Sequence, residues 1–192
     1  MKAYKFFLGL LLCVCFAAGC KDKNKDSKPH FQLDPEFKSY FVNGSVGTKY
    51  IYVDTGDNNL TEIAEIIEIR EIIGELHEDY TSENYVYEWK DNLHNLNSLS
   101  FDIRRNEHRS SFIIHAPPFG SGQGITKTGN DWGPECCVRK LDSVEIFGTT
   151  YYDVLESNQR TLTYYDKLWF AKDVGIIAKF SSSNSMLLKE IQ

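Results

Sequence analysis

Cysteine offers the most specific chemistry in this chain of 192 residues. Of its five cysteines, Cys13 and Cys15 lie within an N-terminal apolar run, Cys20 directly follows that run, and Cys136 and Cys137 are neighbours far along the chain. A thiol placed just after small residues at the end of an apolar run points to processing at a membrane. An adjacent pair points instead to disulfide or metal chemistry.

The N-terminal run has the parts of a secretory signal peptide. Lys2 and Lys5 supply a positive n-region, residues 6–16 form an apolar stretch, and Ala17-Ala18-Gly19 offers small residues for cleavage. The apolar stretch is too short to cross a bilayer, which needs roughly 20 apolar residues. We therefore expect residues 1–19 to be a signal peptide that is removed.

The stretch FAAGC resembles the lipobox of bacterial lipoproteins, although Ala17 stands where Leu is most common. The resemblance implies that diacylglycerol is joined to the Cys20 thiol and that the mature chain begins at this residue. Each buried methylene of an acyl chain contributes about 0.8 kcal/mol, so two or three chains hold a protein at a membrane. The alternative is an ordinary signal peptidase cut near Gly19 that leaves Cys20 as an unmodified thiol.

The residues after Cys20 read KDKNKDSKPHFQLDPE and contain few apolar side chains. We predict a flexible tether over residues 20–36 and a single β-rich domain over residues 37–192. Lys21 and Asp22 also resemble the export signal that carries Bacteroidota lipoproteins to the outer leaflet of the outer membrane, although Lys23 replaces the usual second acidic residue. The expected location is the outer membrane, with surface exposure favoured over a periplasm-facing orientation.

Cys136 and Cys137 would be the remaining thiols of the mature protein in an oxidising envelope. A trans peptide holds neighbouring Cα atoms about 3.8 Å apart, below the usual minimum of about 4.4 Å for a disulfide. A bond between them would be strained and easily reduced. Three interpretations stay open: thiols of minor structural importance, a redox-labile pair, or a metal-linked pair.

Catalytic patterns do not appear in the sequence. The histidines are scattered, and the spacings of zinc proteases, serine hydrolases and phosphate-binding loops do not occur. We therefore expect no catalytic residue, no bound metal and no cofactor. Asp142-Ser143-Val144 resembles the short O-glycosylation motif of Bacteroidota, which makes Ser143 a candidate acceptor.

Aromatic residues form the remaining candidate binding feature, as in LTYYDKLWF. We expect most of them to be core residues, because half of each strand faces inward and aromatic side chains bury the largest areas. The alternative is a stacking surface for a glycan or lipid, for which the candidates are Trp132, Tyr165 and Trp169.

The elements that position these residues are predominantly strands. Runs of β-branched and aromatic residues separated by turn residues predict strands over residues 48–54, 82–89, 98–105, 110–116 and 186–191, and hairpins over residues 138–157 and 160–182. The hairpins are expected to turn near Gly148 and over residues 173–175. Glycine and proline predict a long loop at about residues 117–136.

Residues 60–73 are ambiguous. Their many isoleucines favour a long strand, whereas Asn59 and Glu62 have the spacing of a helical capping box, so a single helix is the alternative. A flat sheet of so many sequential antiparallel strands would expose long edges. The predicted fold is therefore mainly β, an antiparallel meander curled into a barrel, half-barrel or two-layer sandwich.

The segments VEIFGTTYYDVLE, YYDKLWFAKDVGIIAKF and LLKEI resemble lipoproteins abundant in Bacteroidota to which no reaction is assigned. That resemblance implies a β-rich fold and an envelope location. The net charge of −6 and the lack of a basic face argue against nucleic acid as a partner.

Three functions remain. The favoured one is a membrane-anchored, non-catalytic module that binds a protein, glycan or lipid. The alternatives are a periplasm-facing carrier of lipid or another hydrophobic ligand, or an assembly factor, and, less favoured, a hydrolase with its site around Trp132.

Overall fold

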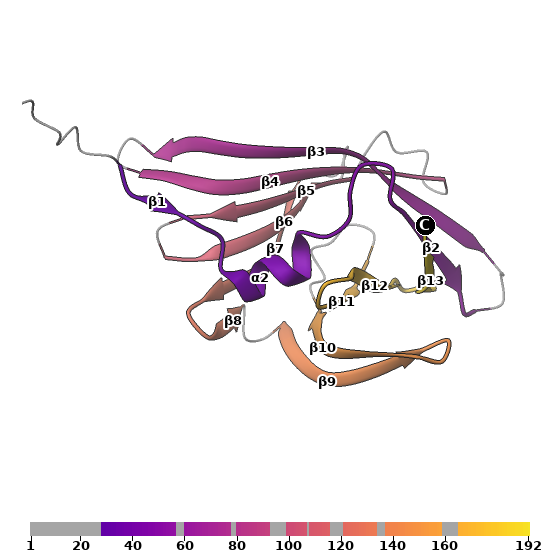
Figure 1. Cartoon of the computed structure of the whole chain (residues 1–192). Helices are drawn as coiled ribbons and strands as arrows, with labels where there is room; N and C mark the ends of the chain where they lie inside the picture. Colours follow the sequence, from indigo (N-terminus) through magenta and orange to yellow (C-terminus); the bar gives the residue numbers. More distant parts are fainter. Residues whose placement is uncertain are drawn as a thin grey trace, which may run out of the picture.

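The computed structural model describes residues 28–56, 60–77, 80–92, 99–106, 108–115, 121–133, 137–158 and 165–192. Strands dominate, and twelve of them form one antiparallel sheet that is nearly closed into a barrel (Figure 1). This confirms the predicted fold class. Within the described ranges, no helix has the length and apolar character needed to cross a membrane.

The sheet follows the chain in a meander whose two halves are joined by the last strand. Its order is β8-β7-β6-β5-β4-β3-β2-β13-β12-β11-β10-β9, and β1 adds a short parallel pairing to β4. The elements are β1 (His30–Phe31), α2 (Pro35–Phe41), β2 (Lys49–Asp54), β3 (Thr61–His77), β4 (Tyr80–Asp91), β5 (Leu99–Arg105), β6 (Ser110–His115), β7 (Ser121–Thr128), β8 (Asp131–Gly133), β9 (Val138–Ile146), β10 (Thr149–Ser157), β11 (Lys167–Ala171), β12 (Gly175–Phe180) and β13 (Ser185–Ile191).

The ambiguous segment is the strand β3, so the helical alternative is wrong. Its first residues pair with β2, and its residues from Ala64 onward pair with β4. The β-branched isoleucines suit this extended backbone, and pairing to two neighbours outweighs the short capping pattern.

The two predicted hairpin turns are confirmed. β9 and β10 are joined at Phe147 and Gly148, whose φ angles are 48° and 80°. β11 and β12 are joined through Asp173 and Gly175, with φ angles of 59° and 95°. Glycine adopts these positive φ angles without steric cost, which is why it punctuates the sequence at both turns.

The predicted loop at about residues 117–136 is wrong over most of its length, because β7 and β8 form a hairpin there. Gly124 shows the reason. A Cβ atom on this residue would lie 2.2 Å from the carbonyl oxygen of Phe112, at the irregularity in the β6–β7 pairing. Glycine therefore permits a close approach of two backbones here.

The predicted tether also ends too late, because the fold begins before residue 37. His30 and Phe31 pair with β4, Leu33 is buried, and α2 starts at Pro35. The Asp34 carboxylate caps the helix by accepting a hydrogen bond from the Phe37 N–H at 2.9 Å. Leu33 and the aromatic residues of α2 supply the apolar burial that orders this charged segment.

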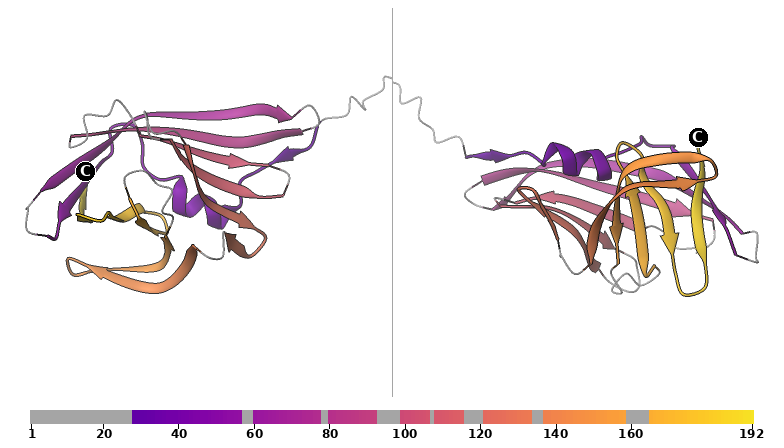
Figure 2. Two further views of the ribbon diagram at one scale, coloured as in Figure 1. Left: turned by 180° about the vertical axis from the view of Figure 1, so that it is seen from behind. Right: turned by 90° about the horizontal axis from the view of Figure 1, so that it is seen from below.

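The helix α2 lies where the barrel does not close. The sheet curves around it, with β4 to β7 on one side and β9 to β12 on the other (Figures 1 and 2). Trp132 of the edge strand β8 stacks on Phe37, and Lys140 of the opposite edge strand β9 binds Glu36. The helix thus bridges both free edges of the sheet.

Candidate functional site

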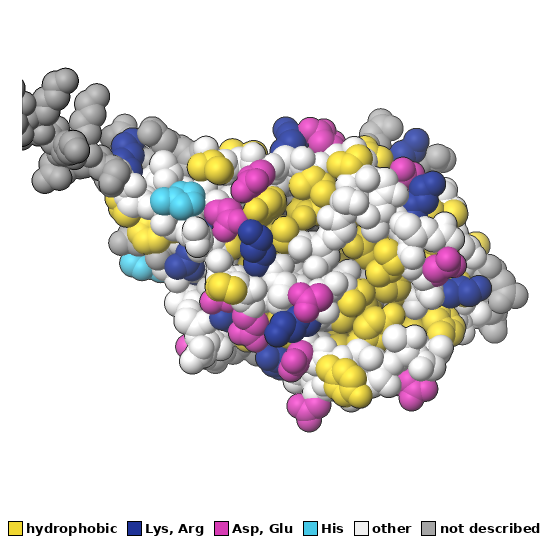
Figure 3. Space-filling view, viewed as in Figure 1, with side chains coloured by type: hydrophobic (Ala, Val, Ile, Leu, Met, Phe, Trp, Pro, Cys, Tyr) yellow, Lys and Arg dark blue, Asp and Glu magenta, His cyan; other side chains and the backbone are white. Residues whose placement is uncertain are grey.

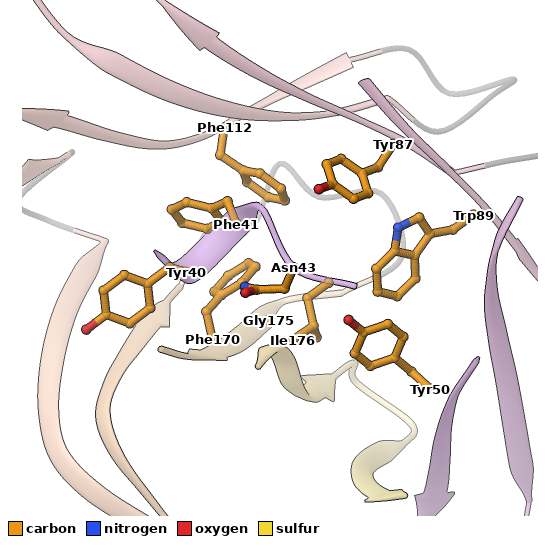
Figure 4. A pocket seen from close by; sticks show the side chains of 10 residues that line it. All are labelled: Tyr40, Phe41, Asn43, Tyr50, Tyr87, Trp89, Phe112, Phe170, Gly175 and Ile176. Carbon is orange, nitrogen blue, oxygen red and sulfur yellow. The ribbon is translucent and has the colours of Figure 1, made fainter. Parts of the chain in front are cut away.

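An aromatic pocket, here called the lumen pocket, lies inside the barrel beside α2 (Figure 4). The helix and the residues just after it supply part of the wall, and the strands β2, β4, β6, β11 and β12 supply the rest. Its lining consists of Tyr40, Phe41, Asn43, Tyr50, Tyr87, Trp89, Phe112, Phe170, Gly175 and Ile176.

The rings of this pocket pack mainly against one another. Tyr50 stacks on Trp89 with ring centroids 4.8 Å apart, and Phe41 stacks on Phe112 at 4.6 Å. The ring of Phe170 meets Phe41 edge-on at 5.0 Å. Such contacts contribute about 0.5–1.5 kcal/mol each beyond their buried area, so this wall is a cohesive part of the core.

The remaining space is small. The cavity measures about 20 Å³, which is room for roughly one water molecule. An acyl chain does not fit in this cavity while α2 is in place.

The phenols of the pocket stay neutral at physiological pH. Burial raises the pKa of both Tyr50 and Tyr87 to about 12. These groups can therefore offer hydrogen bonds or ring contacts, but they do not exchange a proton near neutral pH.

Ion pairs fasten α2 to the barrel. Figure 3 shows basic and acidic side chains interspersed on this face of the molecule. Lys38 Nζ lies 2.6 Å from a Glu83 carboxylate oxygen of β4. Lys127 Nζ of β7 lies 2.8 Å from Asp34 and 3.3 Å from Glu36. Both strands lie on the same side of the gap, and the 3.0 Å ion pair between Lys140 Nζ of β9 and Glu36 ties the helix to the opposite side.

These contacts shift the pKa values of the carboxyl groups. Burial opposes ionisation of Asp34, but hydrogen bonds from Lys127 and the Phe37 N–H outweigh it and lower the pKa. For Glu36, the bond from Lys140 lowers the pKa, with burial acting against it and Lys127 adding to it. Both groups are therefore ionised anchors of the helix at neutral pH.

A buried ion pair lies away from the lumen pocket. Lys179 of β12 donates to Glu62 of β3, and both side chains are almost fully buried. The ammonium also lies 3.9 Å from the centre of the Tyr52 ring. Sequence reasoning missed this pair, because Glu62 looked like a helix-capping residue and nothing local links it to a residue 117 positions away.

The predicted cysteine sites fall largely outside the described residues, which include neither Cys20 nor Cys136. Cys137 is half-buried just before β9, and its carbonyl accepts a hydrogen bond from the Asn158 N–H at 2.7 Å. Ser143 is exposed on β9, opposite Tyr152 of β10, so its hydroxyl is accessible for modification.

The three candidate ligand-facing aromatics do not line the lumen pocket. Trp132 packs on α2, and its ring meets that of Tyr40 edge-on at 5.5 Å. Trp169 donates to the Glu156 carboxylate at 2.8 Å from β11. Tyr165 is half-buried near Lys179. The structure thus places these side chains in three different environments.

Among the described residues, no three His, Cys, Asp or Glu side chains are placed to hold a metal ion. No family model, curated protein or solved structure matches the chain significantly.

Proposed function

We propose that this chain is a lipid-anchored protein of the bacterial outer membrane, held through Cys20, and that its barrel is a non-catalytic module that binds a partner. The observation that carries the second part is the packing of α2 and the aromatic rings inside the barrel. With its interior occupied in this way, the module would recognise its partner on the outer surface.

The point where the chain enters the fold suits such an anchor. β1 pairs with β4 at Thr81 and Ser82, at one end of the long strands β3 and β4 (Figure 1). Eight positions separate Cys20 from Lys28, the first described residue, and such a length of chain reaches at most about 30 Å. The anchor would hold this end of the barrel close to the membrane.

A carrier of lipid is the alternative that this geometry favours less. To admit an acyl chain to the lumen pocket, α2 would have to leave, which breaks the ion pairs of Lys38 and Lys127 and exposes Phe37 and Phe41. Burying one such aromatic side chain contributes about 1.5–3 kcal/mol, so displacement of α2 is costly.

Replacement of Cys20 by alanine tests the anchor. The thiol is the acylation site in this proposal, so Cys20→Ala should move the protein from the detergent-extracted membrane fraction to the soluble envelope fraction. Cys137→Ala is the matched control and should leave the protein in the membrane fraction. Continued detergent-dependent membrane association of Cys20→Ala would contradict the anchor. A separate experiment, protease treatment of intact cells, tests whether the domain faces outward.

A further inference from the structure

The strand β3 has a long free edge, here called the β3 edge and defined as residues 67–73. β2 pairs with β3 only as far as Glu65, and the turn before β2 then closes on Ile66 through hydrogen bonds with Thr48 and Gly47. β4 continues to pair with β3 on the other side up to His77. Among the described residues, no strand pairs with β3 on its β2 side beyond Ile66.

The direction of the main-chain groups on this edge follows from their pairing. The Ile72 carbonyl points toward β4, where the side-chain amide of Asn84 donates to it at 3.3 Å. The pairing of β3 with β4 is regular from Glu68 to Gly74, and main-chain groups alternate in direction along a strand. The N–H and C=O groups of Ile69, Glu71 and Ile73 therefore point outward from the β3 edge.

The side chains around these groups are apolar and acidic. Ile72 and Ile73 are 43% and 69% exposed, although they lie within the sheet. Ile69, Glu71 and Ile73 alternate on the face that leads into the core. A neighbouring strand would therefore present three side chains to an Ile-Glu-Ile series.

The charged side chains of the β3 edge differ in whether an opposite charge lies beside them. Arg70 lies on the opposite face and is held by Glu68 at 3.1 Å and Glu88 at 2.8 Å. Glu71 accepts a hydrogen bond from the neutral phenol of Tyr85 at 3.2 Å, so its negative charge is not balanced by that contact. A basic side chain on an added strand would balance it.

We propose that the β3 edge binds an extended protein segment as an additional antiparallel strand, with a Lys or Arg opposite Glu71 and apolar residues two positions to either side. This names the partner class of the binding module and rests on the proposed function. The segment would gain the outward hydrogen bonds of Ile69, Glu71 and Ile73, and its apolar residues would cover the isoleucines. The turn at Ile66 sets where the added strand must stop.

The test uses the full mature protein in detergent and the capped peptide TVTKTVT, with binding followed by fluorescence anisotropy. The control peptide TVTETVT replaces the central lysine with glutamate. We expect the lysine peptide to bind about fivefold to tenfold more tightly, because one cross-strand charge pair changes from attraction to repulsion. Absence of binding by the lysine peptide up to about 1 mM would overturn the proposal.

Two N-methylated peptides test strand addition itself. Methylation of the central lysine N–H removes a bond to the β3 edge and should abolish binding, whereas methylation of the threonine N–H groups, which point away, should leave it intact. Equal binding by both would show docking through side chains alone and overturn the proposal.

Charge reversal in the protein locates the site. Glu71→Lys should exchange the preference, so that TVTETVT binds more tightly than TVTKTVT. Glu145→Lys, an exposed change on the distant edge strand β9, should leave the original preference unchanged. A dimer of the protein that the peptide does not dissociate would show that a second copy occupies the edge and would contradict this partner class.

These measurements do not depend on Cys20, so their failure is distinguishable from failure of the anchor.

Discussion

At the scale of single residues, the ion pair of Lys179 and Glu62 shows how a charge is tolerated inside the barrel. Both side chains are buried, and the ammonium is held between a carboxylate and the Tyr52 ring. Removal of one partner from such a pair leaves an uncompensated buried charge, whereas removal of both does not. The pair thus favours an arrangement in which β12 and β3 face each other across the interior, because each charge needs its partner there.

Lys179→Met should lower the free energy of unfolding by about 3–5 kcal/mol, because Glu62 then loses its partner in a buried site. The double variant with Glu62→Leu should recover part of this loss. The exposed pair of Lys49 and Glu65 provides the control, and Lys49→Met should change stability by less than about 1 kcal/mol. Urea unfolding measures all of these, and equal effects of the two lysine substitutions would contradict this account.

At the scale of elements, α2 depends on both apolar packing and ion pairs. Phe41 contacts Phe112 of β6 and Phe170 of β11, so one ring joins three elements. Phe41→Ala should therefore cost about 3–5 kcal/mol in unfolding free energy. Val46→Ala, a change at a residue that is 59% exposed, should cost less than about 0.5 kcal/mol. If the two variants unfold at the same denaturant concentration, α2 does not pack as described.

The lowered pKa values of Asp34 and Glu36 predict an acid dependence for the same helix. A carboxyl group with a depressed folded-state pKa stabilises the fold above its unfolded value, and this contribution is lost as the pH falls through the folded value. Stability should therefore decrease as the pH falls from about 5 to about 2. Lys127→Met should make this decrease shallower, as measured by urea midpoints across the range. An unchanged slope would mean that Lys127 does not stabilise these carboxylates.

Elements were predictable from the sequence where the signal was local. The isoleucines of β3 and the glycines of the two hairpin turns act through their own backbone preferences, so these features could be inferred. The helix α2 has local signals too, Asp34 as cap and Pro35 in its first turn. It was missed because seven residues make a weak helix, and its stability comes from packing inside a barrel that the local sequence does not specify.

The candidate site was less predictable than the strands, because it depends on contacts between residues that are far apart in the sequence. The lumen pocket gathers rings from one helix and four strands, and no spacing in the sequence selects Tyr50, Trp89 and Phe170 from the other aromatics. The β3 edge was equally hidden, because the point where β2 stops pairing is set by the turn that closes on Ile66. Long-range pairing decides both features.

At the scale of the whole molecule, we propose that a barrel occupied by its own helix is held at the outer membrane by an acylated N-terminus. In this proposal the partner binds the outer surface, and among the described residues the β3 edge offers main-chain hydrogen-bonding groups that no strand pairs with. In this proposal the lipid is an anchor rather than a cargo, and mass measurements distinguish the two roles.

Native mass spectrometry of the protein extracted from membranes, followed by the same measurement after denaturation, makes that comparison. The account predicts the mass of residues 20–192 plus covalently attached acyl groups in both states, with no further lipid bound. An unmodified N-terminus would contradict the anchor, and an additional lipid present at equal stoichiometry in the native state and lost on denaturation would show that the barrel is a carrier.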